Sequence, residues 1–191
     1  MDLVELIKDA VIEASTSFRN DQLNAYMHAI EIETNENAKW VLEILLDNAK
    51  IAQKNGVPLC DDTGIPHVLV EVGNNTPLPK SFFHDIKSGI KLGLEDLPAR
   101  PMAVKGNSTE RIEQSKGLYN NPGELLTPSF TVDTTIHEGV DIHVLMLGGG
   151  PEIRAHTYKV FHKRDYRKVF EQVLTWLRSE ITMLGCTPCI P

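Results

Sequence analysis

The sequence predicts an α+β fold, with a helical N-terminal part at residues 1–56 and a mixed part at residues 57–191. Three observations support this prediction. Apolar residues recur at helical spacing through the N-terminal part. Residues 65–72 and 140–147 alternate as strands do. A second helical stripe runs from 166 to 184. We therefore expect one domain of 191 residues, either whole or truncated at its C-terminal end, containing a small mixed or antiparallel sheet with flanking helices.

Three helices are expected in the N-terminal part, at residues 2–18, 21–33 and 35–54. Asn35 is the expected N-cap of the third helix, and Asn55-Gly56 is its expected end. The residues expected on the buried face of this helix are Ala38, Val41, Leu42, Leu45, Ala49 and Ala52.

The mixed part begins with a loop, because Pro58 cannot continue a helix. Residues 65–72 are the first expected strand, and Pro66 indicates an edge strand or a strand start. The next helix is expected at 81–94 with Ser81 as its cap.

The second half of the mixed part starts with an irregular stretch at residues 97–128, which is rich in Pro, Gly and Asn. Strands are expected at 129–134 and 140–147, and a short strand-like segment is expected at 157–162. The last helix is expected at 166–184, leading to a cysteine at its C-terminal end.

Composition and charge exclude several classes of function. The net charge is −7 and no run of Lys and Arg occurs, which argues against a nucleic-acid surface. No apolar stretch has the length of a membrane span, and the N-terminus does not resemble a signal peptide, so a cytoplasmic protein is expected. Three cysteines in a reducing compartment, two of them in Cys186-Thr187-Pro188-Cys189, favour metal or redox chemistry over disulfides.

The run Cys60-Asp61-Asp62-Thr63-Gly64 concentrates chemically active side chains in one loop. A cysteine thiolate is a ligand for zinc, copper(I) or iron–sulfur iron. The adjacent carboxylates could orient a substrate or move a proton beside a Lewis-acidic metal. The alternative is a buried structural cysteine, but two neighbouring carboxylates would make a dry core position costly.

Arg100 is a candidate for binding an anion. A planar guanidinium matches a carboxylate with two hydrogen bonds, and an acidic protein needs such a group to hold an anionic substrate. A solvated loop arginine is the alternative interpretation.

Gly148-Gly149-Gly150 follows a predicted strand, where successive backbone N–H groups could bind an anion. It is not a phosphate-binding P-loop, because no Gly-Lys-Ser/Thr follows, and Pro151 removes one donor. A tight turn after the strand is the alternative.

A zinc site is a further alternative. Its candidate ligands show no helical pair set opposite a cysteine pair; they are His137, His143, His156 and His162.

Taken in order, four stretches resemble the N-terminal (alpha) part of the class I fumarase and tartrate dehydratase family of iron–sulfur hydro-lyases. They are residues 60–64, 99–104, 147–150 and 184–191. The resemblance covers nearly the whole chain and implies a 4Fe–4S cluster.

The resemblance also implies roles for individual residues. Cys60 and Cys186 would be cluster ligands, with a third ligand further downstream. Cys189 has no counterpart in the commoner family pattern, so it is either a ligand peculiar to this chain or a structural residue.

Asp62 and Thr63 would act in catalysis by orienting substrate or water, and Asp61, Arg100, Gly149 and Gly150 would bind substrate. Asp61 departs from the family, which more commonly has Gln, because an ionised carboxylate can only accept a hydrogen bond.

The implied function is the reversible hydration of fumarate to (S)-malate. The implied partners are a small dicarboxylate substrate and a beta subunit, without which the chain is expected to be inactive. A homodimer of alpha/beta units is expected. Two alternatives remain open, an L(+)-tartrate dehydratase alpha subunit and a non-catalytic metal-binding interaction module.

Overall fold

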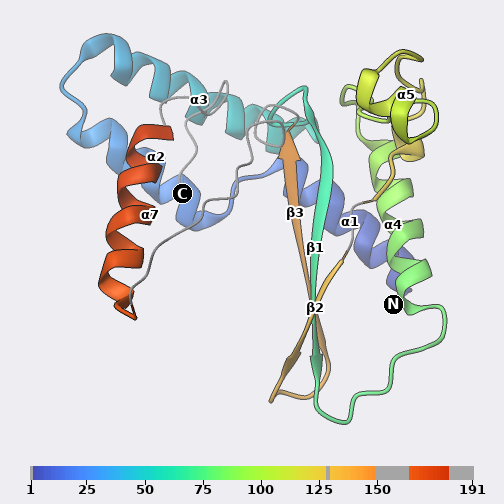
Figure 1. Ribbon diagram of the computed structural model, residues 1–191. Coiled ribbons are helices and arrows are strands. Elements are labelled where there is room, and N and C mark those ends of the chain that lie inside the picture. The colour runs from blue at the N-terminus through green and yellow to red at the C-terminus, as the bar shows by residue number, and fades with distance from the viewer. Residues whose placement is uncertain (1, 128–129, 149–163, 181–191) are drawn as a thin grey trace. The chain divides into compact units, whose positions relative to one another are not determined.

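The computed structural model describes residues 2–127, 130–148 and 164–180 (Figure 1). The chain divides into two compact units, Met1–Gly149 and Gly150–Pro191. The first unit contains the sheet and most of the helices, and the second contributes one described helix.

The three predicted N-terminal helices are confirmed as α1 (Leu3–Thr16), α2 (Asn20–Ile32) and α3 (Glu36–Asn55). The side chain of Asn35 caps α3 as expected, because its Oδ1 accepts hydrogen bonds from the first free backbone N–H groups of the helix. Gly56 ends α3 in the left-handed conformation, with φ of 62°.

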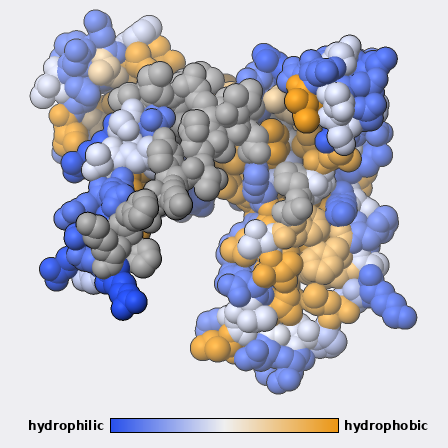
Figure 2. All heavy atoms as spheres, in the orientation of Figure 1, coloured by the Kyte–Doolittle hydropathy of each residue, from blue (hydrophilic) through white to orange (hydrophobic). Residues whose placement is uncertain are grey.

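The predicted buried face of α3 is confirmed in part. Ala49 and Ala52 are buried and Ala38, Leu42 and Leu45 are partly buried, whereas the prediction is wrong for Val41, which is 44% exposed. Within the described residues α3 packs mainly against α2, with a small contact to α1. Because few neighbouring elements cover α3, several of its apolar residues lie at the surface. Figure 2 shows hydrophobic side chains at the surface of the hairpin formed by α2 and α3.

Within the described residues the sheet has three strands, in the order β2-β1-β3. Their bounds are Thr63–Gly73 for β1, Thr131–Thr135 for β2 and Val140–Gly148 for β3. β1 pairs with β2 in parallel and with β3 antiparallel, so the predicted small mixed sheet and its three strands are confirmed. The predicted segment at 157–162 lies outside the described residues.

The edge position predicted from Pro66 is wrong, because β1 is the central strand. The pairing register explains how a proline is tolerated there. Pro66 lies opposite Met146 of β3, whereas β2 pairs with β1 only from Leu69 onward. Among the described residues, the backbone at Pro66 therefore has a strand on one side only, which is where a residue without an N–H can be accommodated.

The predicted helix at 81–94 is confirmed as α4 (Phe82–Asp96), but the Ser81 side chain makes no capping hydrogen bond. The stretch from 97 to 128 is mostly irregular, as predicted. It also contains a short helix, α5 (Ser108–Glu113), and one 3-10 turn, η1 (Pro122–Glu124).

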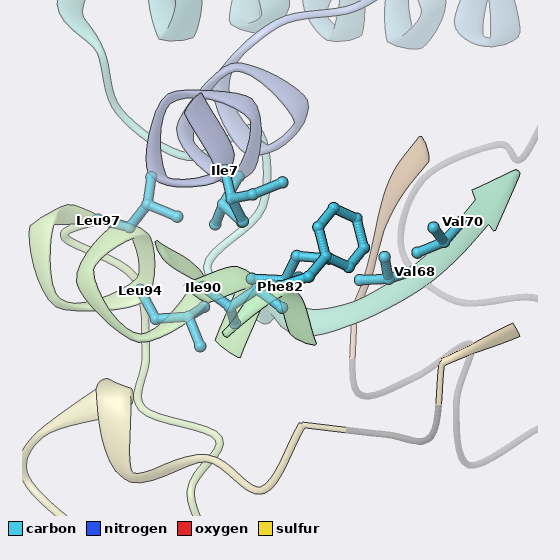
Figure 3. Close-up of a cluster of buried hydrophobic side chains, with 9 residues drawn as sticks. Ile7, Val68, Val70, Phe82, Ile90, Leu94 and Leu97 are labelled. Carbon is cyan, nitrogen blue, oxygen red and sulfur yellow. The ribbon is translucent and has the colours of Figure 1, made fainter. Parts of the chain in front are cut away.

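The core lies between one face of the sheet and the helix pair α1 and α4 (Figure 3). Side chains of alternate β1 residues, among them Val68 and Val70, point toward these helices, as the two-residue period of a strand requires. Ile142 and Val144 of β3 pack against the same cluster. The buried members of the core are Ile7, Val11, Val68, Val70, Phe82, Ile86, Ile90, Leu94 and Leu97.

Two glycines let α1 and α4 approach closely. A Cβ at Gly89 would lie 2.5 Å from the carbonyl oxygen of Val4 and 2.7 Å from the Cβ of Ile7. A Cβ at Gly93 would lie 2.8 Å from the Cβ of Val11. Real Cβ atoms do not sit this close to backbone or branched side chains, so the helix crossing requires both glycines.

The second unit contributes α7 (Tyr166–Glu180), which confirms the last predicted helix as far as residue 180. Residues 181–184 lie outside the described part of the chain. The apolar stripe of α7 is present but not buried, since Tyr166 is 67% exposed and Phe170 is 62% exposed. Across the ranges that the structure describes, no helix combines the length and apolar character that crossing a membrane requires.

We predict that Gly89→Ala destabilises the protein. At an open helix position this substitution would stabilise by up to about 1 kcal/mol through helix propensity. Here the added methyl group collides with α1, and such overpacking costs about 1–3 kcal/mol. Urea denaturation should show the loss, with exposed His84→Ala in the same helix as a control of unchanged or higher stability. A stabilised Gly89→Ala variant would contradict the close packing.

Candidate functional site

The loop that carries Cys60 connects α3 to β1 and is held from two helices. The Leu59 N–H donates to the carbonyl oxygen of Ser15 at 2.9 Å, at the end of α1. The side-chain amide of Asn48, on α3, donates to the carbonyl oxygen of Leu59 at 3.1 Å. These two hydrogen bonds hold the main chain at Leu59, directly before Cys60. The position of the half-buried Cys60 side chain is therefore restrained by the loop.

Arg100 reaches this loop from the end of α4, where Leu97 is buried in the core. The Arg100 N–H donates to the carbonyl oxygen of Asp61 at 3.0 Å. Its side chain contacts both neighbouring carboxylates, with Nη2 2.8 Å from Oδ2 of Asp61 and Nη1 2.8 Å from Oδ1 of Asp62. The fold thus brings together Asp61, Asp62 and Arg100, as the interpretation of these residues as one site requires.

The two contacts of Arg100 differ in quality. The contact with Asp61 is an aligned hydrogen bond. Oδ1 of Asp62 is buried and, among the described residues, accepts no hydrogen bond in spite of its short distance to Nη1. The Asp61 side chain is 68% exposed and that of Asp62 is 33% exposed. Asp62 therefore faces the protein side of the guanidinium, and Asp61 faces solvent.

The electrostatics of the site are dominated by these three groups. The hydrogen bond that Arg100 donates to Asp61, followed by the charges of Asp62 and Asp61, raises the pKa of Arg100 above its usual value. The Cys60 side chain makes the smallest contribution to the raised pKa of Arg100. Two carboxylates and one guanidinium leave a local charge of −1 when Cys60 is protonated.

Gly64 allows the start of β1 to pass close to the segment after Arg100. It is buried and lies at a register shift between Thr63 and Ile65, where β1 has one more residue than β3. A Cβ at Gly64 would lie 3.1 Å from Cγ of Met102, so a larger residue would press on that side chain. Thr63 is paired with Gly148, the first glycine of the triple-glycine motif.

Several predicted site residues lie outside the described part of the chain. They are Gly149, Gly150, Cys186 and Cys189. The backbone of Thr63 is in the sheet, next to the loop. The structure also identifies two anchors that sequence reasoning missed, Asn48 and Ser15, for which the sequence carries no signal because both are ordinary helix residues.

The donor set at the loop is compatible with an iron–sulfur cluster but does not complete one. In the described ranges no group of three or more His, Cys, Asp and Glu side chains is arranged to hold a metal ion. Both carboxylates of the loop contact Arg100, which leaves the Cys60 thiol as the soft donor. Of the zinc candidates, His143 contacts Glu71 on the sheet, at 2.9 Å between Nε2 and Oε2, and His156 and His162 lie outside the described residues.

The arrangement favours an anionic or hydroxyl-bearing ligand. A guanidinium offers several N–H donors, and the carboxylates beside it can accept hydrogen bonds from hydroxyl groups. The half-buried thiol next to them can bind a soft metal.

Comparisons with known proteins identify relatives of the chain. The family model described as fumarate hydratase (Fumerase) matches residues 4–191. The chain is 28% identical over its whole length to a protein named putative L(+)-tartrate dehydratase subunit alpha, from Methanocaldococcus jannaschii. It is 29% identical over 83% of its length to a putative fumarate hydratase class I from Geobacillus stearothermophilus. The chain spans 65% of the first relative and 29% of the second.

We predict that Asn48→Ala loosens the loop and exposes Cys60. A hydrogen bond contributes about 0.5–1.5 kcal/mol, and 1 kcal/mol of local stability corresponds to roughly a fivefold change in population. Peptide-resolved mass spectrometry should therefore show faster alkylation of Cys60 by iodoacetamide, by about two- to twelvefold. Gln53→Ala, an exposed position of the same helix, should leave the rate unchanged. Equal rates in the two variants would mean that Asn48 does not hold the loop.

Proposed function

Because the chain belongs to the fumarate hydratase family, we propose that it is the alpha subunit, or the N-terminal part, of a 4Fe–4S hydro-lyase that reversibly hydrates fumarate to (S)-malate. The observation that carries this proposal is the meeting of Arg100 with the Cys60 loop. The anion-binding group, Arg100, and the soft metal ligand, Cys60, are 40 residues apart in the sequence, and the fold brings their segments together. An iron–sulfur hydro-lyase acting on a dicarboxylate needs both.

Cys60 and Cys186 would hold the cluster, with a third ligand supplied from outside this chain or, as an alternative, by Cys189. When bound, the cluster would supply Lewis acidity that weakens the C–O bond of the substrate. A thiolate at Cys60 suits this role, because the neighbouring acidic side chains are engaged by Arg100 and the thiol is the soft donor of the loop.

Arg100 would hold the substrate carboxylate on the carbon that does not carry the hydroxyl group. Asp62 would keep the guanidinium oriented from the buried side, and Thr63 would help to orient substrate or water. Asp61, together with the backbone of Gly149 and Gly150, would complete the substrate-binding surface. The paired contacts of Arg100 support these roles, because a guanidinium fixed from one side can present its remaining donors in a defined direction.

The complete enzyme would need a second component. One relative is named as an alpha subunit, and the chain spans about two thirds of its length. We propose a beta subunit that supplies the proton-abstracting group, so that this chain alone is inactive. A dimer of alpha/beta units and a location in the cytoplasm remain predictions.

L(+)-tartrate is the second candidate substrate. The relative that matches the whole chain carries the name of a tartrate dehydratase subunit. Asp61, as a hydrogen-bond acceptor, would suit the additional hydroxyl group of tartrate.

Steady-state assays of the chain with its beta part test the proposal. We expect hydration of fumarate to (S)-malate after anaerobic loading with iron and sulfide, and we expect Cys60→Ser to lower the iron content of the complex. Turnover of tartrate but not fumarate would establish the second candidate. Iron content that Cys60→Ser does not change, together with no turnover of either acid, would point to a non-catalytic interaction module.

We predict that Arg100→Lys lowers kcat/KM strongly. Lysine keeps the charge but loses the planar pair of donors. Hydrogen bonds to charged groups contribute about 1.5–3 kcal/mol, so the expected loss is roughly 10- to 150-fold at 1.36 kcal/mol per tenfold. Arg19→Lys, which alters an exposed ion pair with Asp21, should leave kcat/KM unchanged. Equal activity of wild type and Arg100→Lys would exclude the proposed role.

A further inference from the structure

We propose that Asp61 is a specificity-determining residue that competes with the substrate carboxylate for Arg100. Its Oδ2 occupies Nη2 of the guanidinium at 2.8 Å, a donor that an incoming carboxylate would use. This inference rests on the proposed role of Arg100 as the substrate clamp and adds what the substrate must displace to reach it.

The geometry singles out Asp61 rather than Asp62 as the competitor. Asp62 lies on the buried side, with Oδ1 out of contact with solvent. Asp61 is on the exposed side and takes the aligned hydrogen bond. A ligand arriving from solvent therefore meets the Asp61 carboxylate first and must replace it at Nη2.

The Asp61 side chain can leave without disturbing the loop. Its carboxylate has no other hydrogen bond or ion pair in the described part of the chain. The main chain of the loop is held separately, through the bond from the Arg100 N–H to the carbonyl oxygen of Asp61. Rotation of one side chain thus opens the guanidinium while the two segments stay together.

Charge gives the competition its selectivity. With Asp61 in place, the three groups carry a net charge of −1, which opposes an anion. Exposed ion pairs are weak, so the contact can be broken by a ligand that makes a better one. A carboxylate that engages two N–H donors at once meets this condition, whereas a singly contacting anion does not.

The test is the reactivity of Arg100 toward phenylglyoxal in the 191-residue chain, followed by peptide-resolved mass spectrometry. In Asp61→Asn, Arg100 should react about two- to fivefold faster than in wild type, the range expected for loss of an exposed ion pair. Succinate should protect Arg100 in both proteins, at a concentration about two- to fivefold lower in Asp61→Asn.

The chain provides matched controls. Asp61→Glu keeps the charge and should react more like wild type than Asp61→Asn. Arg19 is paired with Asp21 in a similarly exposed position, so its rate should be unchanged in the Asp61 variants and should rise in Asp21→Asn. Circular dichroism checks that each variant is folded.

Two results would overturn the inference. If Asp61→Asn leaves the Arg100 rate unchanged while Asp21→Asn accelerates Arg19, Asp61 does not restrict the guanidinium. If Arg100 becomes faster but succinate protects neither protein, the group displaced is not a competitor of a dicarboxylate. Failure of the proposed hydro-lyase activity is seen separately, in the turnover assay of the complete complex, and leaves the reactivity measurements unaffected.

Discussion

The close crossing of α1 and α4 is the contact on which the candidate site depends. The glycines at 89 and 93 let the two helices touch, and together the helices cover one face of the sheet. Each helix then supports one half of the site. The end of α1 offers the carbonyl oxygen of Ser15 to the Cys60 loop, and the end of α4 leads through buried Leu97 to Arg100. A change in the helix crossing would therefore move the two halves of the site relative to each other.

The same dependence explains which parts of the fold could be read from the sequence. Helices α1, α2 and α3 were predictable because apolar spacing is a local property, as are the caps of α3 at Asn35 and Gly56. The central position of β1 was not predictable. Pro66 is tolerated there because β2 pairs with β1 only from Leu69 onward, three residues after the proline, so β2 does not need its missing N–H. Gly89 and Gly93 lower the helix propensity of α4, and only the position of α1 shows why glycine is needed there.

The candidate site shows a similar division. The candidate residues could be identified from the sequence, because a thiol and two carboxylates are adjacent in one loop and an arginine can bind an anion. The contacts between these residues could not be predicted. The sequence predicted that Arg100 binds a substrate anion, but in the structure its side chain contacts the carboxylates of Asp61 and Asp62. Long-range ion pairs of this kind depend on the helix crossing and leave no periodic signal in the sequence.

The exposure of the site sets a condition on whatever covers it. Arg100 is 54% exposed, so its contacts with Asp61 and Asp62 are now screened by water. If a second component closed over the loop, the same groups would carry their net charge of −1 into a less polar environment, where an uncompensated charge is costly. The covering surface must then bring a positively charged side chain, or the Asp61 side chain must turn out to solvent. An anionic substrate adds to this requirement, because it brings further negative charge to the same place. A component that completes the site must therefore also neutralise its negative charge.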